Sequence, residues 1–336
     1  MLLLFVVCRW LCCCDCCLTC SLDCWAMEAF DVSPSLVSFA EDLANAAGTV
    51  IRGYWRVPIE VESKDEPGRP VAESPVTVAD REAEAVMRKM IESAYPSHGI
   101  YGEEFGNVRL DAEYVWVLDP IDGTKSFITG KPLFGTLIAL LHRGKPVMGV
   151  IDQCVLKERW VGANGCTRLN GKAVRCKGVA GLKDAMLYAT TPHMFAPGLE
   201  EDRFGRLRDR VKRPLYGCDC YAYALCASGF VDLVVEADLG VYDYCALVPV
   251  VTFAGGMMTD WEGKDLTLQS HSVSKGRVVA AANQELWKAA VDVLSGRSGG
   301  PNLGPFAVLQ GLSLPSFVLG AAAGAALVSW LSSRRP

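Results

Sequence analysis

The amino-acid sequence predicts an α+β or layered α/β fold, in which helices cover the faces of β-sheets. Two observations support this prediction. Residues 34–56 and 80–93 repeat apolar side chains with the period of an amphipathic helix, and residues 114–175 contain short apolar runs typical of consecutive strands. The second half then mixes helical and strand-like segments. A length of 336 residues allows one large domain or two modest ones.

The first two predicted elements are helices. Ser33 followed by Pro34 is a start signal for the helix over 34–56, and Asp80 is positioned to cap the helix over 80–93. The apolar stripe of the first helix consists of Leu36, Val37, Phe39, Ala40, Leu43, Ala46 and Ala47.

Strands follow these helices. Residues 114–118 have the pattern of a short buried strand that ends at Asp119. Two apolar runs between Phe134 and Ile151 flank the tetrapeptide HRGK at 142–145, which predicts a β-hairpin with a glycine turn. Two further short strands are expected over 159–162 and 172–175.

The second half of the domain has a mixed pattern. Helices are expected near 219–229, 243–253 and 284–294, and strands near 231–236, 257–260 and 278–281. No internal repeat is visible. Together these elements define a folded domain over residues 27–295.

Charge and cysteine content limit the classes of partner and compartment. The formal net charge is −5 without a basic cluster, which argues against nucleic acid as a partner. Of fifteen cysteines, eight lie between Cys8 and Cys24 and seven are scattered from Cys154 to Cys245. The scattered seven are typical of small core residues in a reducing compartment, cytosol or plastid, and not of a disulfide framework.

Both ends of the chain are unusual. The Cys-rich residues 1–26 allow three interpretations, a zinc ligand set, a palmitoylated segment or translated upstream sequence, and we expect them to lie outside the fold. Residues 296–311 are predicted to form a flexible linker. The tail 312–336 contains about twenty uncharged residues, so a membrane anchor and a loosely packed extension both remain open.

The segment VWVLDPIDGTKSF contains the first candidate metal ligands. It puts Asp119 at a strand end and Asp122 three residues later, and these two carboxylates and the Ile121 carbonyl are hard oxygen ligands of the kind that magnesium prefers. If Gly123 and Thr124 begin a helix, their backbone N–H groups are suited to phosphate oxygens. The alternative is that Asp-Pro and Asp-Gly only mark a loop and a turn.

Two further acidic clusters favour the metal interpretation. Glu103 and Glu104 follow a glycine after an apolar run, and Asp80 precedes a helix. Taken singly, adjacent glutamates are usually solvated and an aspartate before a helix is usually a cap. Three such clusters in one chain are harder to attribute to coincidence.

With these motifs the sequence resembles the inositol monophosphatase family. The resemblance rests on GEE at 102–104, DPIDGT at 119–124 and VEADLGVYDYCAL at 235–247, and it covers about residues 35–295. The family usually has Trp before its downstream aspartate, whereas this chain has Tyr242 before Asp243. The resemblance implies a layered αβαβα sandwich and a homodimer.

The resemblance also implies roles for individual residues. Glu103, Asp119 and the Ile121 carbonyl would hold one Mg²⁺, and Asp119, Asp122 and Asp243 would hold a second. Glu103 and the Thr124 hydroxyl would orient and activate the attacking water, and Asp80 would support that water or a third, weaker Mg²⁺. The four histidines, His98, His142, His193 and His271, fall in none of these motifs.

Within that family the second half is most similar to the histidinol-phosphate phosphatases. Asp219 stands where polyol phosphatases of the family usually carry a small neutral residue, and Glu236 occupies the position that grips the non-phosphate part of the substrate. Gly123 and Thr124 would receive the phosphate. Two carboxylates beside the leaving group suit a cation better than a sugar, because charge-assisted hydrogen bonds contribute about 1.5–3 kcal/mol each.

Three functional hypotheses follow. The leading one is Mg²⁺-dependent hydrolysis of L-histidinol phosphate, a small phosphomonoester, to L-histidinol and phosphate in histidine biosynthesis. The second is an inositol or other sugar monophosphatase, which would be favoured if substitution of Asp219 left selectivity unchanged. Asp219 also has the alternative role of a helix N-cap, and both roles could coexist. The third is a membrane-tethered binding protein with a relict metal site.

Overall fold

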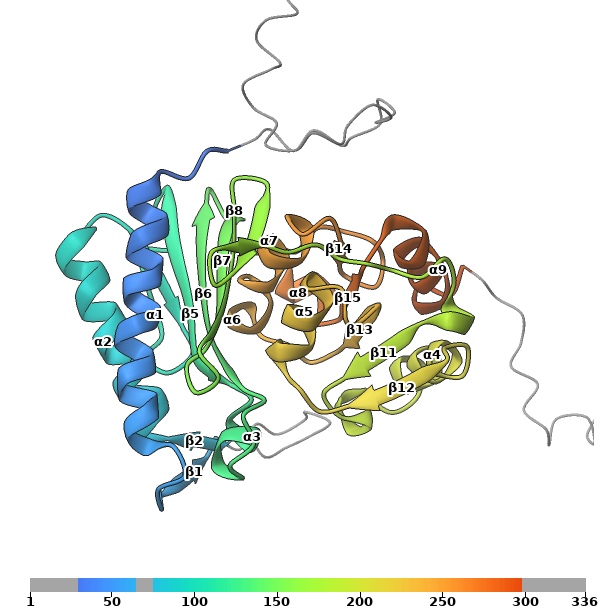
Figure 1. The fold of residues 1–336 in the computed structure, drawn as a ribbon, viewed down its shortest axis with the longest axis horizontal. Coiled ribbons are helices and arrows are strands. Elements are labelled where there is room, and N and C mark those ends of the chain that lie inside the picture. Colours follow the sequence, from blue (N-terminus) through green and yellow to red (C-terminus); the bar gives the residue numbers. More distant parts are fainter. Residues whose placement is uncertain (1–29, 65–74, 298–336) are drawn as a thin grey trace, which may run out of the picture. The chain divides into compact units, whose positions relative to one another are not determined.

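The computed structural model describes residues 30–64 and 75–297 (Figure 1). The interpretations of residues 1–26 and of the tail 312–336 fall outside these residues, as does nearly all of the predicted linker 296–311. Within the described residues, no helix combines the length and apolarity that a membrane span requires.

An eight-stranded sheet forms the first half of the domain. Its strand order is β10-β9-β8-β7-β6-β5-β3-β4, and all neighbouring strands are antiparallel except β3 and β5, which run parallel. The strands are β3 (Gly99–Gly102), β4 (Asn107–Val108), β5 (Tyr114–Asp122), β6 (Gly135–His142), β7 (Lys145–Gln153), β8 (Glu158–Ala163), β9 (Cys166–Leu169) and β10 (Lys172–Ala173).

Two helices, α1 (Pro34–Tyr54) and α2 (Val78–Ala94), pack together on one face of this sheet (Figure 1). Their contacts with β5, β6 and β7 enclose an apolar core that includes Leu43, Met87 and Trp116. A separate two-stranded sheet, β1 (Val61–Ser63) and β2 (Pro75–Thr77), lies at the entry to α2.

A second sheet of five strands forms the other half, in the order β12-β11-β13-β15-β14. Helices α5 (Cys220–Ala227), α6 (Val241–Tyr244) and α7 (Leu247–Thr252) lie between the two sheets, and α4 (Leu199–Arg208) and α9 (Gln284–Leu294) pack together on the outer side (Figure 1). The strands are β11 (Met186–Ala189), β12 (Arg213–Tyr216), β13 (Leu233–Glu236), β14 (Met257–Thr259) and β15 (Val278–Ala281).

The layers therefore alternate as αβαβα, which confirms the predicted α+β sandwich. Three apolar cores lie between the outer helices and the sheets and between the two sheets, and the core between the sheets, which includes the middle helices, holds Cys220, Cys226 and Cys245. All seven cysteines from Cys154 to Cys245 are free and five of them are buried, as expected of small core residues.

Several predicted elements are confirmed with shifted ends. The first helix ends at Tyr54, and the second begins at Val78 with Thr77 as its N-cap, so Asp80 lies inside the helix. The hairpin of β6 and β7 and the terminal helix α9 are as expected. The strand predicted over 172–175 is shorter, because only Lys172 and Ala173 pair with β9.

The single helix predicted over 243–253 is wrong. The chain forms two short helices, α6 and α7, separated at Cys245 and Ala246. The physical reason is Pro249, which has no N–H and whose ring would clash with the carbonyl of Cys245 in a continuous helix. The break leaves Asp243 in the short helix α6.

Candidate active site

A β-bulge brings Asp119 and Asp122 to the same side of β5. The strand does not end at Asp119, as the sequence predicted, but continues to Asp122, and its register with β6 shifts so that Asp119 faces Leu137 and Asp122 faces Gly135. In a regular strand, residues three apart point to opposite faces. The extra residue of the bulge reverses this, so both carboxylates point to the same side.

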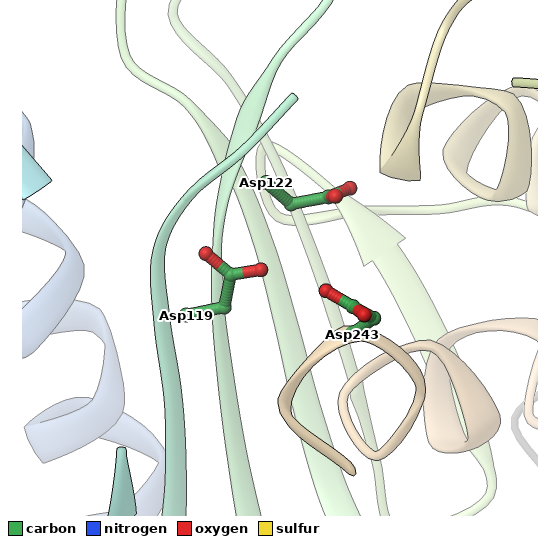
Figure 2. A group of neighbouring side chains, drawn as sticks. All are labelled: Asp119, Asp122 and Asp243. Atoms are coloured by element: carbon green, nitrogen blue, oxygen red, sulfur yellow. The ribbon is translucent and has the colours of Figure 1, made fainter. Parts of the chain in front are cut away.

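Asp243 completes a cluster of three aspartates (Figure 2). It lies on α6, which packs against β5, and its Oδ2 accepts a 2.6 Å hydrogen bond from the Gly240 backbone N–H. One oxygen from each of Asp119, Asp122 and Asp243 lies within 4.8 Å of the others. Figure 2 shows the carboxylates from the strand and from the helical turn converging on one point.

The electrostatics of this cluster fit a divalent cation. Burial, with repulsion from Glu103 and the neighbouring aspartates, raises the pKa of Asp119 well above its usual range, and burial with repulsion from Asp219 and Asp243 does the same for Asp122. Asp119 Oδ1 is buried and has no hydrogen-bond partner in the described part of the chain. An unpartnered buried carboxylate oxygen among other hard oxygens is the donor set of Mg²⁺ or a similar ion.

Glu103 is placed beside Asp119 by the parallel pairing of β3 and β5. Gly102 pairs with Leu118, and the Glu103 N–H donates to the Leu118 carbonyl at 3.2 Å, so Glu103, which directly follows β3, lies beside Asp119 of β5. Burial raises the Glu103 pKa to about 8. The Lys64 ammonium lies 3.4 Å from Glu103 Oε1 and 2.6 Å from Glu104 Oε1.

A buried glutamate on α2 fixes the turn that carries Glu103. Glu84 accepts hydrogen bonds from the backbone N–H groups of Glu104 and Phe105 and forms an ion pair with Arg88. A side chain at Gly102 would collide with the Glu84 carboxylate. The glycine of the GEE motif is therefore required by packing.

Thr124, Ile121 and Asp80 lie together at the end of β5. The Thr124 hydroxyl is 3.0 Å from the Ile121 carbonyl and 3.4 Å from Asp80 Oδ1. Asp80 Oδ2 accepts hydrogen bonds from the N–H and hydroxyl of Thr77 in a capping box, and burial raises the Asp80 pKa. Asp80 thus has one oxygen in the capping box and the other facing Thr124.

Gly123 and Asp219 lie against each other. Gly123 precedes α3 (Thr124–Ile128), as the sequence predicted, and a Cβ added there would lie 2.9 Å from Asp219 Oδ2. Asp219 stands at the N-cap position of α5 but its side chain makes no capping hydrogen bond; its Oδ2 accepts one from Ser126 at 3.1 Å instead. Burial raises the Asp219 pKa to about 6. The N-cap alternative for Asp219 therefore fails.

Glu236 ends β13 and is 3% exposed. Its two oxygens accept hydrogen bonds from the Thr190 N–H and the Tyr223 hydroxyl, both at 2.9 Å. Burial raises the Glu236 pKa to about 7. Its carboxylate is therefore held in one orientation.

One cavity of about 730 Å³ joins these groups. All the residues predicted for the site line it except Asp80, which reaches it through Thr124. One wall comes from the loop that follows β11, with Thr190, Thr191 and the exposed His193. His193 is thus the histidine that borders the cavity, although no motif contains it.

Comparison with protein families identifies the chain. Residues 34–295 match the model of the inositol monophosphatase family. The chain belongs to the inositol monophosphatase family. It is therefore a phosphatase, and members of the inositol monophosphatase family are metal-dependent, typically with Mg²⁺.

Relatives and solved structures agree with this family. The chain is 52% identical over 258 residues to "Bifunctional phosphatase IMPL2, chloroplastic" of Arabidopsis thaliana, covering 75% of this chain and 72% of that one. It is 38% identical over 197 residues to a histidinol-phosphatase of Mycobacterium tuberculosis, covering 56% and 75%. A solved inositol monophosphatase from Zymomonas mobilis has a TM-score of 0.68 and 39% identity over 78% of this chain and 98% of that one.

Some residues of this inositol monophosphatase site were not predicted. Four further side chains contact the site carboxylates: Lys64, Ser126, Thr190 and Tyr223. None of them lies in the three motifs that carry the family resemblance. Ser126 was visible as part of DGTKS, two residues after Thr124. The other three come from distant segments, and only the folded chain brings them to the site.

Proposed function

We propose that this chain hydrolyses L-histidinol phosphate to L-histidinol and phosphate in a reaction that depends on Mg²⁺. The observation that carries the proposal is the pair of the half-buried Asp219 and the buried Glu236, two carboxylates in the same cavity as the three aspartates. A neutral polyol offers these carboxylates only hydroxyl groups. Histidinol offers an ammonium and an imidazole, which form stronger, charge-assisted hydrogen bonds.

The backbone around Asp219 supports a functional role for this side chain. Gly217, Cys218 and Asp219 have consecutive positive φ angles of 85°, 105° and 47°. For a residue other than glycine, such a conformation costs on the order of 1–3 kcal/mol. A capping role does not explain that cost, because the Asp219 side chain caps nothing. The strained turn places the Asp219 carboxylate in the lining of the cavity.

Within this proposal, Glu103, Asp119 and the Ile121 carbonyl would hold one Mg²⁺, and Asp119, Asp122 and Asp243 would hold a second. A third, weaker ion would lie near Asp80. When bound, Mg²⁺ withdraws charge from the phosphoryl oxygens and lowers the pKa of water.

The residues around Thr124 supply the orientation of the nucleophile. Thr124 Oγ1 donates toward Ile121 O or Asp80 Oδ1, so its lone pairs can accept a hydrogen bond from the attacking water. Glu103 accepts the proton of that water as its oxygen bonds to phosphorus. The bond between phosphorus and the leaving oxygen breaks, and the histidinol alkoxide takes a proton from solvent.

The names of relatives support this substrate and leave one alternative. Proteins named histidinol-phosphatase from Mycobacterium tuberculosis and Chlorobaculum parvum are 38% and 31% identical to this chain. An inositol or other sugar monophosphatase is the second candidate, favoured by the structural likeness to the Zymomonas mobilis enzyme. The relict-site alternative loses support because Asp119, Asp122 and Asp243 remain clustered.

Location and assembly are part of the same proposal. The 52% identical relative is named chloroplastic, which supports a plastid location and a reducing compartment for the free cysteines. A homodimer is the assembly that the family resemblance implies.

The test compares L-histidinol phosphate with its N-acetyl derivative, which lacks the ammonium charge. We expect kcat/KM of the full chain with Mg²⁺ to fall by about 10- to 100-fold for the derivative, the equivalent of one charge-assisted hydrogen bond. Addition of EDTA should abolish hydrolysis of both esters. Equal kcat/KM values for the two esters would contradict recognition of a cation.

A further inference from the structure

A second cavity, of about 940 Å³, lies outside the candidate active site. Its lining residues come from α1, from the strands β7, β8 and β9 and from the loops between them. Figure 1 shows α1 on this face of the eight-stranded sheet. We call the cavity the α1 groove. It is lined by side chains that include Val37, Asn45, Arg52, Lys157, Arg159 and Arg168.

The alternation of strand residues explains why cations face the α1 groove. Val161 on β8 pairs with Arg168 on β9, and both line the groove. Their neighbours point the other way: Trp160 is buried beneath α7, and the Thr167 hydroxyl donates to the Val250 carbonyl of α7 at 2.7 Å. The two strands therefore turn their apolar face to the core and a cationic face to the groove.

One arginine of the groove is fixed in place. Arg159 Nε donates to Asp152 Oδ1 at 2.7 Å, and another guanidinium nitrogen donates to Asn45 Oδ1 at 2.9 Å. Asp152 is buried, and the positive charges of Arg159 and Arg52 oppose the rise in its pKa that burial causes. This carboxylate is therefore already neutralised by the protein.

The remaining charges leave the α1 groove positive. Besides the pair of Asp152 and Arg159, it is lined by three cations, Arg52, Lys157 and Arg168, and by one acid, Glu41. Within the described residues, the Lys157 and Arg168 side chains have no hydrogen bond or ion pair. Two unpaired cations facing one groove are notable in a chain whose net charge is −5.

The groove also has an apolar part. Val37 of α1 faces it, and so do Val161 and Ala163 of β8 and the buried Cys154. A purely ionic ligand would leave these apolar side chains exposed to water. A ligand that also has a compact apolar body would bury them.

We propose that the α1 groove binds a small organic phosphate, a phosphoryl group joined to a compact apolar or aromatic body. Lys157 and Arg168 donate to the phosphoryl oxygens, and the apolar body lies on Val37 and Val161. The site is separate from the catalytic one and does not depend on which ester the enzyme hydrolyses.

The test is isothermal titration calorimetry of the full chain with phenylphosphonate, which a phosphatase does not hydrolyse. EDTA is present, because without metal the three active-site aspartates repel an anion. We expect one binding site. The double variant Lys157→Glu and Arg168→Glu should bind at least about tenfold more weakly, since two charge-assisted contacts become repulsive.

A matched control uses the double variant Arg175→Glu and Lys177→Glu, which reverses two exposed charges outside the groove. It should bind phenylphosphonate like the wild type. Absence of binding to the wild type, or equal weakening in both double variants, would overturn the proposal. A change of affinity in Asp219→Asn, which removes a negative charge from the active-site cavity, would place the ligand there and also overturn the proposal.

Inorganic phosphate serves as the second probe. We expect it to bind the wild type more weakly than phenylphosphonate, because it lacks the apolar body. Equal affinities would overturn the assignment of an organic phosphate.

Discussion

The Cys220 backbone N–H donates a hydrogen bond of 2.5 Å to Asp122 Oδ2. Cys220 is the first residue of α5 and directly follows Asp219. The proposed metal ligand Asp122 is therefore held by the residue next to the proposed selectivity residue. In this proposal, the residues for substrate recognition and for metal binding are linked through one short segment of backbone.

This relationship predicts the behaviour of Cys220→Pro. Proline is favoured at the first position of a helix but has no N–H, so it removes the donor to Asp122. The Mg²⁺ concentration for half-maximal activity should rise by about 10- to 100-fold, since a hydrogen bond to a charged group contributes about 1.5–3 kcal/mol. Cys220→Ala keeps the N–H and loses the same sulfur, so it should stay near the wild type. Equal Mg²⁺ requirements in both variants would show that this bond does not support the metal site.

Gly123→Ala tests the contact between the phosphate loop and Asp219. The new Cβ would lie about 3 Å from the Asp219 carboxylate, and Gly123 has φ 89°. We expect KM for L-histidinol phosphate to rise because Asp219 is displaced. Gly130→Ala is the control, since it introduces similar backbone strain at φ 74° with no atom nearer than 3.5 Å. Similar KM values in the two variants would show that backbone strain, and not displacement of Asp219, causes the rise in KM.

Asp119→Asn should have opposite effects on activity and on the stability of the metal-free protein. Turnover should be abolished, because Asp119 is proposed to bind both ions. In EDTA the melting temperature should rise, since the buried one of three mutually repelling carboxylates is neutralised. The exposed Asp111→Asn should change neither quantity. Turnover retained by Asp119→Asn would contradict the proposed ligand set.

His98 predicts a pH dependence of stability. Partial burial lowers the His98 pKa, and its Nδ1 accepts a 3.1 Å hydrogen bond from Trp116 Nε1, which requires the unprotonated nitrogen. Because the folded pKa lies below the unfolded value of about 6.5, this stability is complete above that pH and is lost as the pH falls toward the folded pKa.

Urea midpoints between pH 7.5 and 5.5 measure this effect. The wild-type midpoint should fall toward acid more steeply than that of His98→Gln. The variant His271→Gln, at an exposed histidine, should keep the wild-type slope. A wild-type slope in His98→Gln would assign the acid sensitivity to other groups.

The parts of the fold that follow hydrophobic periodicity could be predicted. The long helix α1 and the β6–β7 hairpin carry strong local patterns and form where expected. Strands β11 and β12 were missed because both are short and neither is fully buried, whereas the equally short β13 and β15 are buried throughout and were predicted. Short elements of this kind are set by their neighbours in the sheet and not by their own sequence.

The geometry of the candidate site also depends on residues that are distant in the sequence. The sequence contains Asp119, Asp122 and Asp243, but it predicts that the strand ends at Asp119, whereas the DPID segment belongs to a bulged strand paired with β6. A bulge depends on the partner strand, which the DPID residues do not encode. In the same way, the hydrogen bond from Ser126 to Asp219 joins residues 93 positions apart. Asp219 makes this bond instead of a capping bond, and the local sequence does not predict it.

A competition assay tests the substrate most directly. The purified full chain with Mg²⁺ receives L-histidinol phosphate and myo-inositol 1-phosphate at equal concentration in one tube, and the two alcohols are quantified. The wild type should release mainly histidinol, and Asp219→Asn, which keeps the side-chain shape without the charge, should lose most of that preference. Preferential release of inositol by the wild type would contradict the assignment to histidinol phosphate and leave a sugar monophosphatase.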